Sequence, residues 1–251
     1  MARCRRAAID RPWALLGAPL FFLACAAPGL AYDRTGSIGA SPFSANADEG
    51  DAQGMLVDLV RAMDRATHTS TKILVRPFAR SLQDTARGDA DFHMPLIQDE
   101  AVAPPKGLDY VMNADFGQVH FVIYSRKAQA FDMHNLGAAK GVETEPGHDA
   151  FFAFPVQSTH CVPCSLDKVL SGHADALVVA SEIVDPMLRE PRYRGIHRAL
   201  YKSYPVRALV PVGKDSKAAR EYLAEGAARL KKSGEMWTIT HHNLPFEDWQ
   251  P

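Results

Sequence analysis

Motifs for catalysis and for nucleotide binding are missing from the 251 residues of this chain. There is no Gly-rich phosphate loop, no His-Glu-x-x-His and no Gly-x-Ser-x-Gly, which excludes the common P-loop, zinc-peptidase and serine-hydrolase sites. Basic residues are not in excess either, with 28 Lys and Arg against 29 Asp and Glu. No basic run after residue 31 is suited to neutralise a row of phosphates. We therefore expect no catalytic activity, no cofactor and no nucleic-acid partner.

Apolar runs long enough to span a membrane are missing after the first thirty residues, so we expect a soluble mature chain. The beginning differs, because a basic start precedes an apolar segment over residues 13–27 and the small-residue positions of Gly29-Leu30-Ala31. The basic start holds four arginines: Arg3, Arg5, Arg6 and Arg11. This pattern predicts a secretory signal peptide over residues 1–31 and a periplasmic protein. Cys25 follows Phe22, where a lipoprotein signal normally has Leu, so we expect no lipid anchor.

Cysteine is scarce, and only Cys161 and Cys164 lie outside the predicted leader. In an oxidising compartment a close pair most often forms a disulfide, which here would pin the loop before a helix. Two alternatives stay open. One is a redox-active pair, in which a helix N-terminus near Cys164 favours the thiolate, and the other is a metal site that uses His160 with both thiolates. The metal site needs a fourth ligand that the sequence does not identify, so we expect a structural disulfide and no metal.

One segment occurs twice in the chain. Residues 81–91 and 165–175 share Ser, Leu, Gly, Ala and Asp at the same five places. Each copy predicts a short helix that begins at Ser, ends at a glycine in the left-handed conformation and leads into an apolar strand. The glycines are Gly88 and Gly172, and the strands are residues 92–97 and 176–180. A helix that leads into a buried strand is half of a β-α-β unit, so the repeat indicates two α/β lobes.

The remaining patterns complete the two lobes. Residues 38–97 read as β-α-β-α-β, in which the first helix begins at Met55 and shows apolar residues at helical spacing. Further apolar strands are predicted over residues 119–124 and 204–212. An amphipathic helix follows over residues 215–233. The fold class is therefore α/β, with a doubly wound sheet and flanking helices in each lobe.

Several motifs in this order carry a resemblance to a known family. They are a Pro-Phe-Ser loop after the first strand, a Gly-x-Ala-Asp turn into each central strand, Leu-Val-Pro-Val-Gly-Lys and a Leu-Lys-Lys-Ser-Gly ending of the last long helix. Together they resemble the periplasmic solute-binding proteins of ABC importers, in the amino-acid-type branch (family 3) with the type II periplasmic-binding fold. The resemblance covers most of residues 35–250.

This resemblance implies two lobes joined by two hinge strands. Residues 32–123 and 210–251 would form the first lobe, and residues 124–209 would form the second. A small ligand would bind between the lobes, beyond the carboxyl ends of their strands, and closure of the hinge would exclude water from it.

Candidate ligand contacts lie where the predicted strands end. Phe78 follows the second strand and Phe43 lies in the Pro-Phe-Ser loop; the family often places a stacking ring at such positions, although each ring could equally pack in the protein. The other candidates lie at the end of the third strand, at a possible helix start and at the end of the strand after the second repeat. They are Pro95, Gln98, Gly147, His148, Ser181 and Glu182. Free N–H groups at Gly147 could hold an anionic group, and a plain turn there is the alternative.

Two binding groups of the family are missing. Amino-acid binders carry an arginine after the third strand, at a position that falls near Ala103, and no arginine occurs between Asp89 and Arg126. The aspartate that holds the ligand's ammonium group would fall near Ala180. We therefore expect that the ligand is not a standard α-amino acid.

The sequence thus predicts a monomeric periplasmic protein that captures a small polar ligand by hinge closure, with an inner-membrane ABC permease as a further partner. Two alternatives remain. One is an exported accessory or sensor protein, and the other is an enzyme of dehydratase or CxxC redox type on the same scaffold. Catalysis would require a titratable residue in the cleft, for which Glu182, His93 and His148 are the candidates.

Overall fold

The computed structural model describes residues 32–40, 46–48, 51–213 and 216–243. Within these residues the strands are β1 (Arg34–Gly39), β2 (Asn46–Asp48), β3 (Asp51–Gln53), β4 (Thr71–Arg76), β5 (Phe92–Ile97), β6 (Leu108–Tyr110), β7 (Gln118–Arg126), β8 (Val142–Thr144), β9 (Gln157–Ser158), β10 (Ala176–Ala180) and β11 (Ile196–Pro211). The helices are α1 (Met55–Thr67), α2 (Phe78–Ala86), α3 (Val162–Ser171), α4 (Ser181–Val184), α5 (Lys217–Ser233) and α6 (Glu235–Asn243). None of the helices described is long and apolar enough to cross a membrane.

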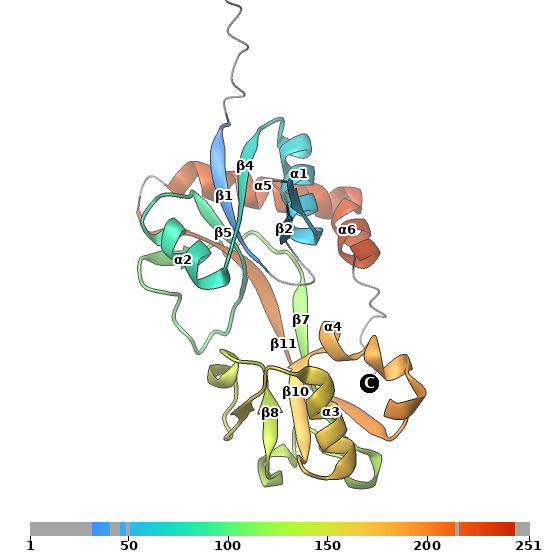
Figure 1. Cartoon of the computed structure of the whole chain (residues 1–251). Helices are drawn as coiled ribbons and strands as arrows, with labels where there is room; N and C mark the ends of the chain where they lie inside the picture. The colour runs from blue at the N-terminus through green and yellow to red at the C-terminus, as the bar shows by residue number, and fades with distance from the viewer. Residues whose placement is uncertain (1–31, 41–45, 49–50, 214–215, 244–251) are drawn as a thin grey trace, which may run out of the picture. The chain divides into compact units, whose positions relative to one another are not determined.

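The strands form one mixed sheet in the order β4-β1-β5-β11-β7-β10-β8-β9, with β6 also paired to β11, and β2 and β3 pair separately (Figure 1). Strand β1 lies parallel to both β4 and β5, which confirms the predicted β-α-β-α-β start. Strand β11 is long enough to serve two parts of the sheet. Its C-terminal part pairs with β5 and β6, and its N-terminal part pairs with β7. We call the part around β1 the first lobe and the part around β10 the second lobe.

The first lobe has a core between its sheet and the helices α1, α5 and α6. Helix α1 buries the apolar stripe that the sequence predicted, including Leu56, Leu59, Val60 and Met63. These side chains meet buried residues of β1, β5 and α5 in one cluster. The helix periodicity of α1 therefore determines which of its faces covers the sheet.

The second lobe has a core on each face of its sheet. One core joins α3 and α4 to alternate residues of β7 and β10, and includes Tyr124 and Leu177. The other core lies on the opposite face and includes Phe121 and Val178. Successive side chains of a strand point to opposite faces, and both faces are apolar here because both are covered.

The repeated segment forms the predicted helix, glycine and strand in both lobes, but the helices begin at Phe78 and Val162, three residues before the predicted starts at Ser81 and Ser165. Strands β5 and β10 have the predicted bounds, and Gly88 and Gly172 have φ angles of +81° and +79° after α2 and α3. One further local prediction was wrong. The strand expected over residues 204–212 begins at Ile196, because antiparallel pairing with β7 sustains an extended backbone through a segment that carries charged residues. After Gly147, where either a helix start or a plain turn was possible, the chain forms a three-residue 3-10 turn, Asp149–Phe151.

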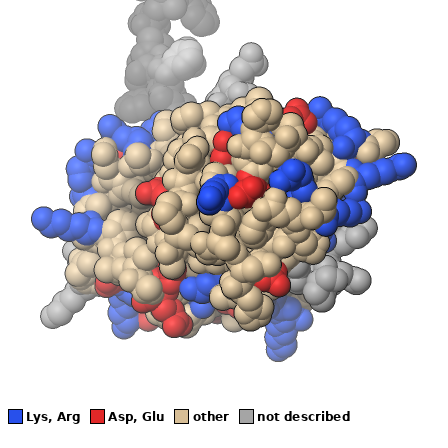
Figure 2. All heavy atoms as spheres, turned by 90° about the horizontal axis from the view of Figure 1, so that it is seen from below, with Lys and Arg blue, Asp and Glu red and all other residues tan. Residues whose placement is uncertain are grey.

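Residues on and next to β7 and β11 pack in the core of the first lobe at one end of these strands and in a core of the second lobe further along. Phe116 and Val206 pack in the first-lobe core, whereas Val119 and Tyr204 pack in a second-lobe core. The predicted lobe boundaries at residues 123/124 and 209/210 lie within the same two strands and remain predictions. On the face seen in Figure 2, basic and acidic side chains are interspersed.

Candidate functional site

A cavity of about 930 Å³ lies where the two lobes face each other. The ends of β1 and β5, together with helix α1, contribute Gly39, Pro95 and Met55 from the first lobe. The end of β10 and the start of α4 contribute Ala180 and Ser181 from the second lobe. The cavity therefore lies beyond the carboxyl ends of the central strands, where ligands of open α/β sheets bind.

The first-lobe wall of the cavity is mainly apolar. It includes Met55 and Leu59 from α1, Phe78 from α2, and Met236 and Trp237 from α6. Phe78 and Trp237 are 43% and 56% exposed, so these rings present large apolar surfaces that a ligand can cover. Phe78 packs edge-on against the ring of His93 at 5.2 Å, which orients it without burying it.

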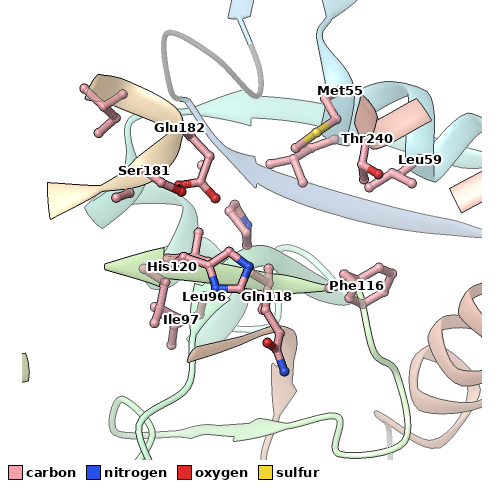
Figure 3. A pocket seen from close by; sticks show the side chains of 18 of the residues that line it. Met55, Leu59, Leu96, Ile97, Phe116, Gln118, His120, Ser181, Glu182 and Thr240 are labelled. Carbon is pink, nitrogen blue, oxygen red and sulfur yellow. The ribbon is translucent and has the colours of Figure 1, made fainter. Parts of the chain in front are cut away.

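The second-lobe wall carries most of the polar side chains. Ser181, Glu182 and Asp185 come from α4 and the residue after it, His120 from β7, and Arg198 from β11. In Figure 3 the carboxyl group of Glu182 and the ring of His120 extend into the same space, with Met55 on the far side. His120 is oriented by its Nδ1, which lies 2.7 Å from Ser203 Oγ. The cavity thus has one apolar side and one side rich in hydrogen-bonding groups.

Glu182 is a titratable residue of the cavity whose surroundings raise its pKa. Burial raises its pKa to about 7, and the negative charge of Asp185 acts in the same direction. The hydroxyl of Ser181 donates a hydrogen bond to Glu182 Oε2 over 3.3 Å and partly opposes this rise. No Lys or Arg within the described residues forms an ion pair with Glu182, so the carboxyl can gain or lose a proton near neutral pH.

His148 and Glu145 form a second polar group at the cavity. Burial lowers the pKa of His148 and raises the pKa of Glu145, so each neutral form is favoured. The two side chains approach to 3.8 Å between Nδ1 and Oε2, which is too long for a hydrogen bond. His148 Nδ1 is buried and hydrogen-bonds to no described residue, while its ring packs edge-on against Phe121 at 5.2 Å. A bound molecule could satisfy this nitrogen.

Asp185 and Arg198 form an ion pair at the second-lobe wall. Asp185 also accepts a hydrogen bond from the hydroxyl of the buried Tyr124. The charges of Asp185 and Arg198 therefore compensate each other. Glu145 and Glu182, the other carboxyl groups of this wall, have no Lys or Arg partner in the described part of the chain.

Six of the eight predicted contacts line the cavity: Phe78, Pro95, Gly147, His148, Ser181 and Glu182. Their role in binding remains a prediction. Gln98 is buried outside the cavity lining, where its Oε1 accepts a hydrogen bond from Arg207 Nε over 3.1 Å. Phe43 lies outside the described residues.

His93, the third candidate for catalysis, is a core residue. It is fully buried, its Nδ1 lies 2.6 Å from Ser81 Oγ, and burial lowers its pKa to about 4. Both ring nitrogens have protein partners, since Nε2 lies 3.1 Å from the carbonyl oxygen of Pro95. His93 therefore supports the end of β5 and does not project into the cavity lining.

Several lining residues were missed from the sequence. Asp185 lies four residues after Ser181, which is one helical turn, so it could have been found by extending the predicted strand end into a helix. His120 and Arg198 gave no such signal, because their place depends on the pairing of β7 with β11. Trp237 lies in α6, a helix that the sequence did not delimit.

Cys161 and Cys164 form a disulfide, with Cα atoms 5.3 Å apart, at the start of α3. Neither cysteine belongs to the residues that line the cavity. In the described ranges no group of three or more His, Cys, Asp or Glu could hold a metal ion, so the alternative metal site at His160 has no ligand set there.

Solved structures show which class of fold this is. The chain is similar to the GluR0 ligand-binding core in complex with L-glutamate, with a TM-score of 0.67, 11% identity, and coverage of 86% of this chain and 100% of that one. It is also similar to a histidine kinase sensor domain that resembles periplasmic binding proteins, with a TM-score of 0.62, 18% identity, and coverage of 84% and 96%. The arginine-, lysine-, histidine-binding protein ArtJ from Geobacillus stearothermophilus matches with a TM-score of 0.60, 13% identity, and coverage of 85% and 96%.

These likenesses confirm the predicted fold: the chain has the two-lobed type II periplasmic-binding fold. Among its structural neighbours are a substrate-binding protein and a substrate-binding domain of amino-acid ABC transporters from Streptococcus pneumoniae. No protein-family model and no curated protein sequence matches the chain.

Proposed function

We propose that this chain is an exported, periplasmic binding protein that captures a small organic molecule in the cavity between its lobes. The observation that carries the proposal is the cavity itself, because its walls come from both lobes and β11 runs through both. Small rotations about β7 and β11 would bring the apolar wall onto a ligand held by the polar wall. The similarity to proteins of ABC transporters supports delivery of the ligand to an inner-membrane ABC permease.

The two walls indicate the chemistry of the ligand. Glu145 and Glu182 have no Lys or Arg partner among the described residues, whereas Arg198 is already paired with Asp185. A cationic amine would favour the ionised form of Glu182, and an apolar body would cover Phe78 and the other exposed rings. A ligand carboxylate would repel the ionised form of Glu182 and would find Arg198 already paired with Asp185, so it is disfavoured. We therefore favour an amine that carries an apolar group and no carboxylate.

A thermal-shift experiment with matched ligands tests this proposal. The probes are 2-phenylethylamine, L-phenylalanine and 3-phenylpropanoate, which share a phenyl ring and differ in their charged groups. We expect the amine to raise the unfolding midpoint most, and Glu182→Gln to reduce that rise. A larger rise with 3-phenylpropanoate would contradict the ligand chemistry. No rise with these probes, polyamines, sugars or organic acids would contradict ligand capture itself.

A sensor module is a second candidate, since the chain also shares its fold with a histidine kinase sensor domain. Both candidates require a ligand in the cavity, and they differ in the event that binding triggers. Uptake of the ligand by cells should stop without the chain if it serves an importer, and should persist if it serves a sensor. An enzyme on the same scaffold would use Glu182 as its acid or base, and chemical change of the bound molecule would show it.

A further inference from the structure

The disulfide between Cys161 and Cys164 lies in a loop that other bonds already hold. The N–H of Cys161 donates to Thr159 Oγ1 over 3.2 Å, and the N–H of Ser165 donates to the carbonyl oxygen of Cys161 over 3.0 Å. Below the loop, Ser165 Oγ donates to the buried carboxylate of Glu143. These contacts fix the main chain on both sides of the disulfide without using either sulfur.

The same carboxylate is secured from a second direction. Lys168 Nζ lies 2.7 Å from Glu143 Oε1, so Glu143 joins β8 to two positions of α3. The disulfide closes a ring of only a few residues, and the stabilisation that a cross-link contributes grows with the length of the chain it closes. As a purely structural cross-link, this disulfide would therefore add little to the stability of the fold.

The two sulfur atoms differ in their surroundings. Cys161 is the N-cap residue of α3, and its Sγ accepts a hydrogen bond from the N–H of Cys164 over 3.3 Å. Cys161 is half-buried, whereas Cys164 is exposed on the first turn of the helix. A thiolate at Cys161 would keep this hydrogen bond and gain from the helix dipole, because helix N-termini stabilise thiolates. Cys161 is thus the better leaving group, and Cys164 is the sulfur that a partner can reach.

We propose that Cys161 and Cys164 form a thiol–disulfide exchange site that oxidises a dithiol of another exported protein. A partner thiolate attacks Cys164 Sγ, the S–S bond breaks, and its electron pair passes to Cys161 Sγ. The second partner thiolate then attacks the partner sulfur of the mixed disulfide and releases Cys164. The partner gains a disulfide, the two partner thiol protons pass to Cys161 and Cys164 or to water, and a small-molecule disulfide such as oxidised glutathione restores the pair.

This site is separate from the ligand cavity, so it does not depend on ligand capture, and it rests on the proposed function only for the export of the chain. Neither cysteine lines the cavity, and α3 packs against the face of the second-lobe sheet that carries Tyr124. The proposal depends on the exposure of Cys164 and on the hydrogen bond to Cys161, both of which a silent structural disulfide would not need.

Equilibration with glutathione tests the proposal on residues 32–251, which form one compact unit. The folded chain and the same chain in urea are each brought to equilibrium with reduced and oxidised glutathione, and the free thiols are trapped by alkylation. We expect the equilibrium constant for reduction to be about tenfold larger in the folded chain, because the fold favours the Cys161 thiolate. An equal or smaller constant in the folded chain would overturn the proposal, since a structural disulfide is favoured by folding.

Single-cysteine variants give a second measurement. In Cys164→Ser the remaining Cys161 should react with iodoacetamide at a lower pH midpoint than the remaining Cys164 does in Cys161→Ser. Equal midpoints would contradict the assigned roles of the two sulfur atoms. Both variants should fold, because the loop is held by Thr159, Ser165 and Glu143. Loss of folding in both would show that the loop needs its disulfide and would also overturn the proposal.

Discussion

The hydroxyl of Tyr124 donates a hydrogen bond of 2.8 Å to the carboxylate of Asp185. Tyr124 is fully buried in the second-lobe core, and Asp185 lines the cavity, so this bond joins the core to the ligand wall. Burial and the negative charge of Asp185 both raise the pKa of Tyr124. The tyrosine therefore stays protonated and remains a donor at any pH near neutral.

Replacing Tyr124 by Phe should lower the free energy of unfolding by about 1 kcal/mol. The ring would still fill its place in the core, so the loss would come from the hydrogen bond to Asp185. Urea unfolding measures the change. Tyr201→Phe is the control, because its hydroxyl hydrogen-bonds to neutral main-chain groups of Phe151, at 3.4 Å, and of Ala153, and not to a described carboxylate. An equal loss in both variants would contradict a special role for the bond to Asp185.

Glu182 should make the stability of the chain depend on pH. Its pKa is raised from 4.5 to about 7 in the folded state, so the folded chain retains a proton that the unfolded chain has lost between these values. The contribution of protonated Glu182 to the free energy of unfolding is complete below about pH 4.5 and is lost as the pH rises through about 7. Glu182→Gln cannot lose a proton there, so its free energy of unfolding should fall by about 2 kcal/mol less than that of the wild type between pH 5 and pH 8.

Urea unfolding at several pH values provides this comparison. His148 and Glu145 titrate in both proteins, so their contributions cancel in the difference between wild type and variant. The neighbours that face Glu182, which include Ser181, Asp185 and His120, are also unchanged. Parallel curves for the two proteins would show that Glu182 is not held in a neutral form by the fold.

Local sequence patterns predicted the elements that position the site. Gly88 and Gly172 marked helix ends because only glycine adopts left-handed φ angles without steric cost, and this constraint acts within a few residues. The strand ends then predicted Ser181, Glu182 and Pro95 at the cavity. These features depend on neighbouring residues, so one sequence is sufficient to find them.

Other parts of the site depend on residues far apart in the chain. The pairing of Asp185 with Arg198 and Tyr124 requires α4, β11 and β7 to meet. Gln98 was predicted at the cavity from its place after β5, but Arg207 on β11 holds its side chain elsewhere. Neither contact has a signal in local periodicity, because each forms only when separate strands align.

Phe78 should contribute to binding more than to stability. Its ring is 43% exposed at the cavity, so Phe78→Ala should weaken binding of 2-phenylethylamine about tenfold while changing the free energy of unfolding little. Titration calorimetry measures the binding. Met133→Ala is a matched control, since Met133 is 58% exposed and does not line the cavity. Similar weakening in both variants would contradict a ligand contact at Phe78.

Gly36 should tolerate no side chain, because its backbone lies close to the buried ring of Phe92. Gly36 pairs with Phe92 of β5, and a Cβ atom at residue 36 would overlap the Phe92 ring. Gly36→Ala should therefore lower the free energy of unfolding by about 2 kcal/mol, since neither the strand nor the buried ring can move freely. Gly137→Ala should change it by less than about 0.5 kcal/mol, because a Cβ there meets no atom within 4 Å. Equal effects in the two variants would show that β1 can shift away from Phe92, and the packing of Gly36 on this ring would then not fix the position of β1 in the first-lobe sheet.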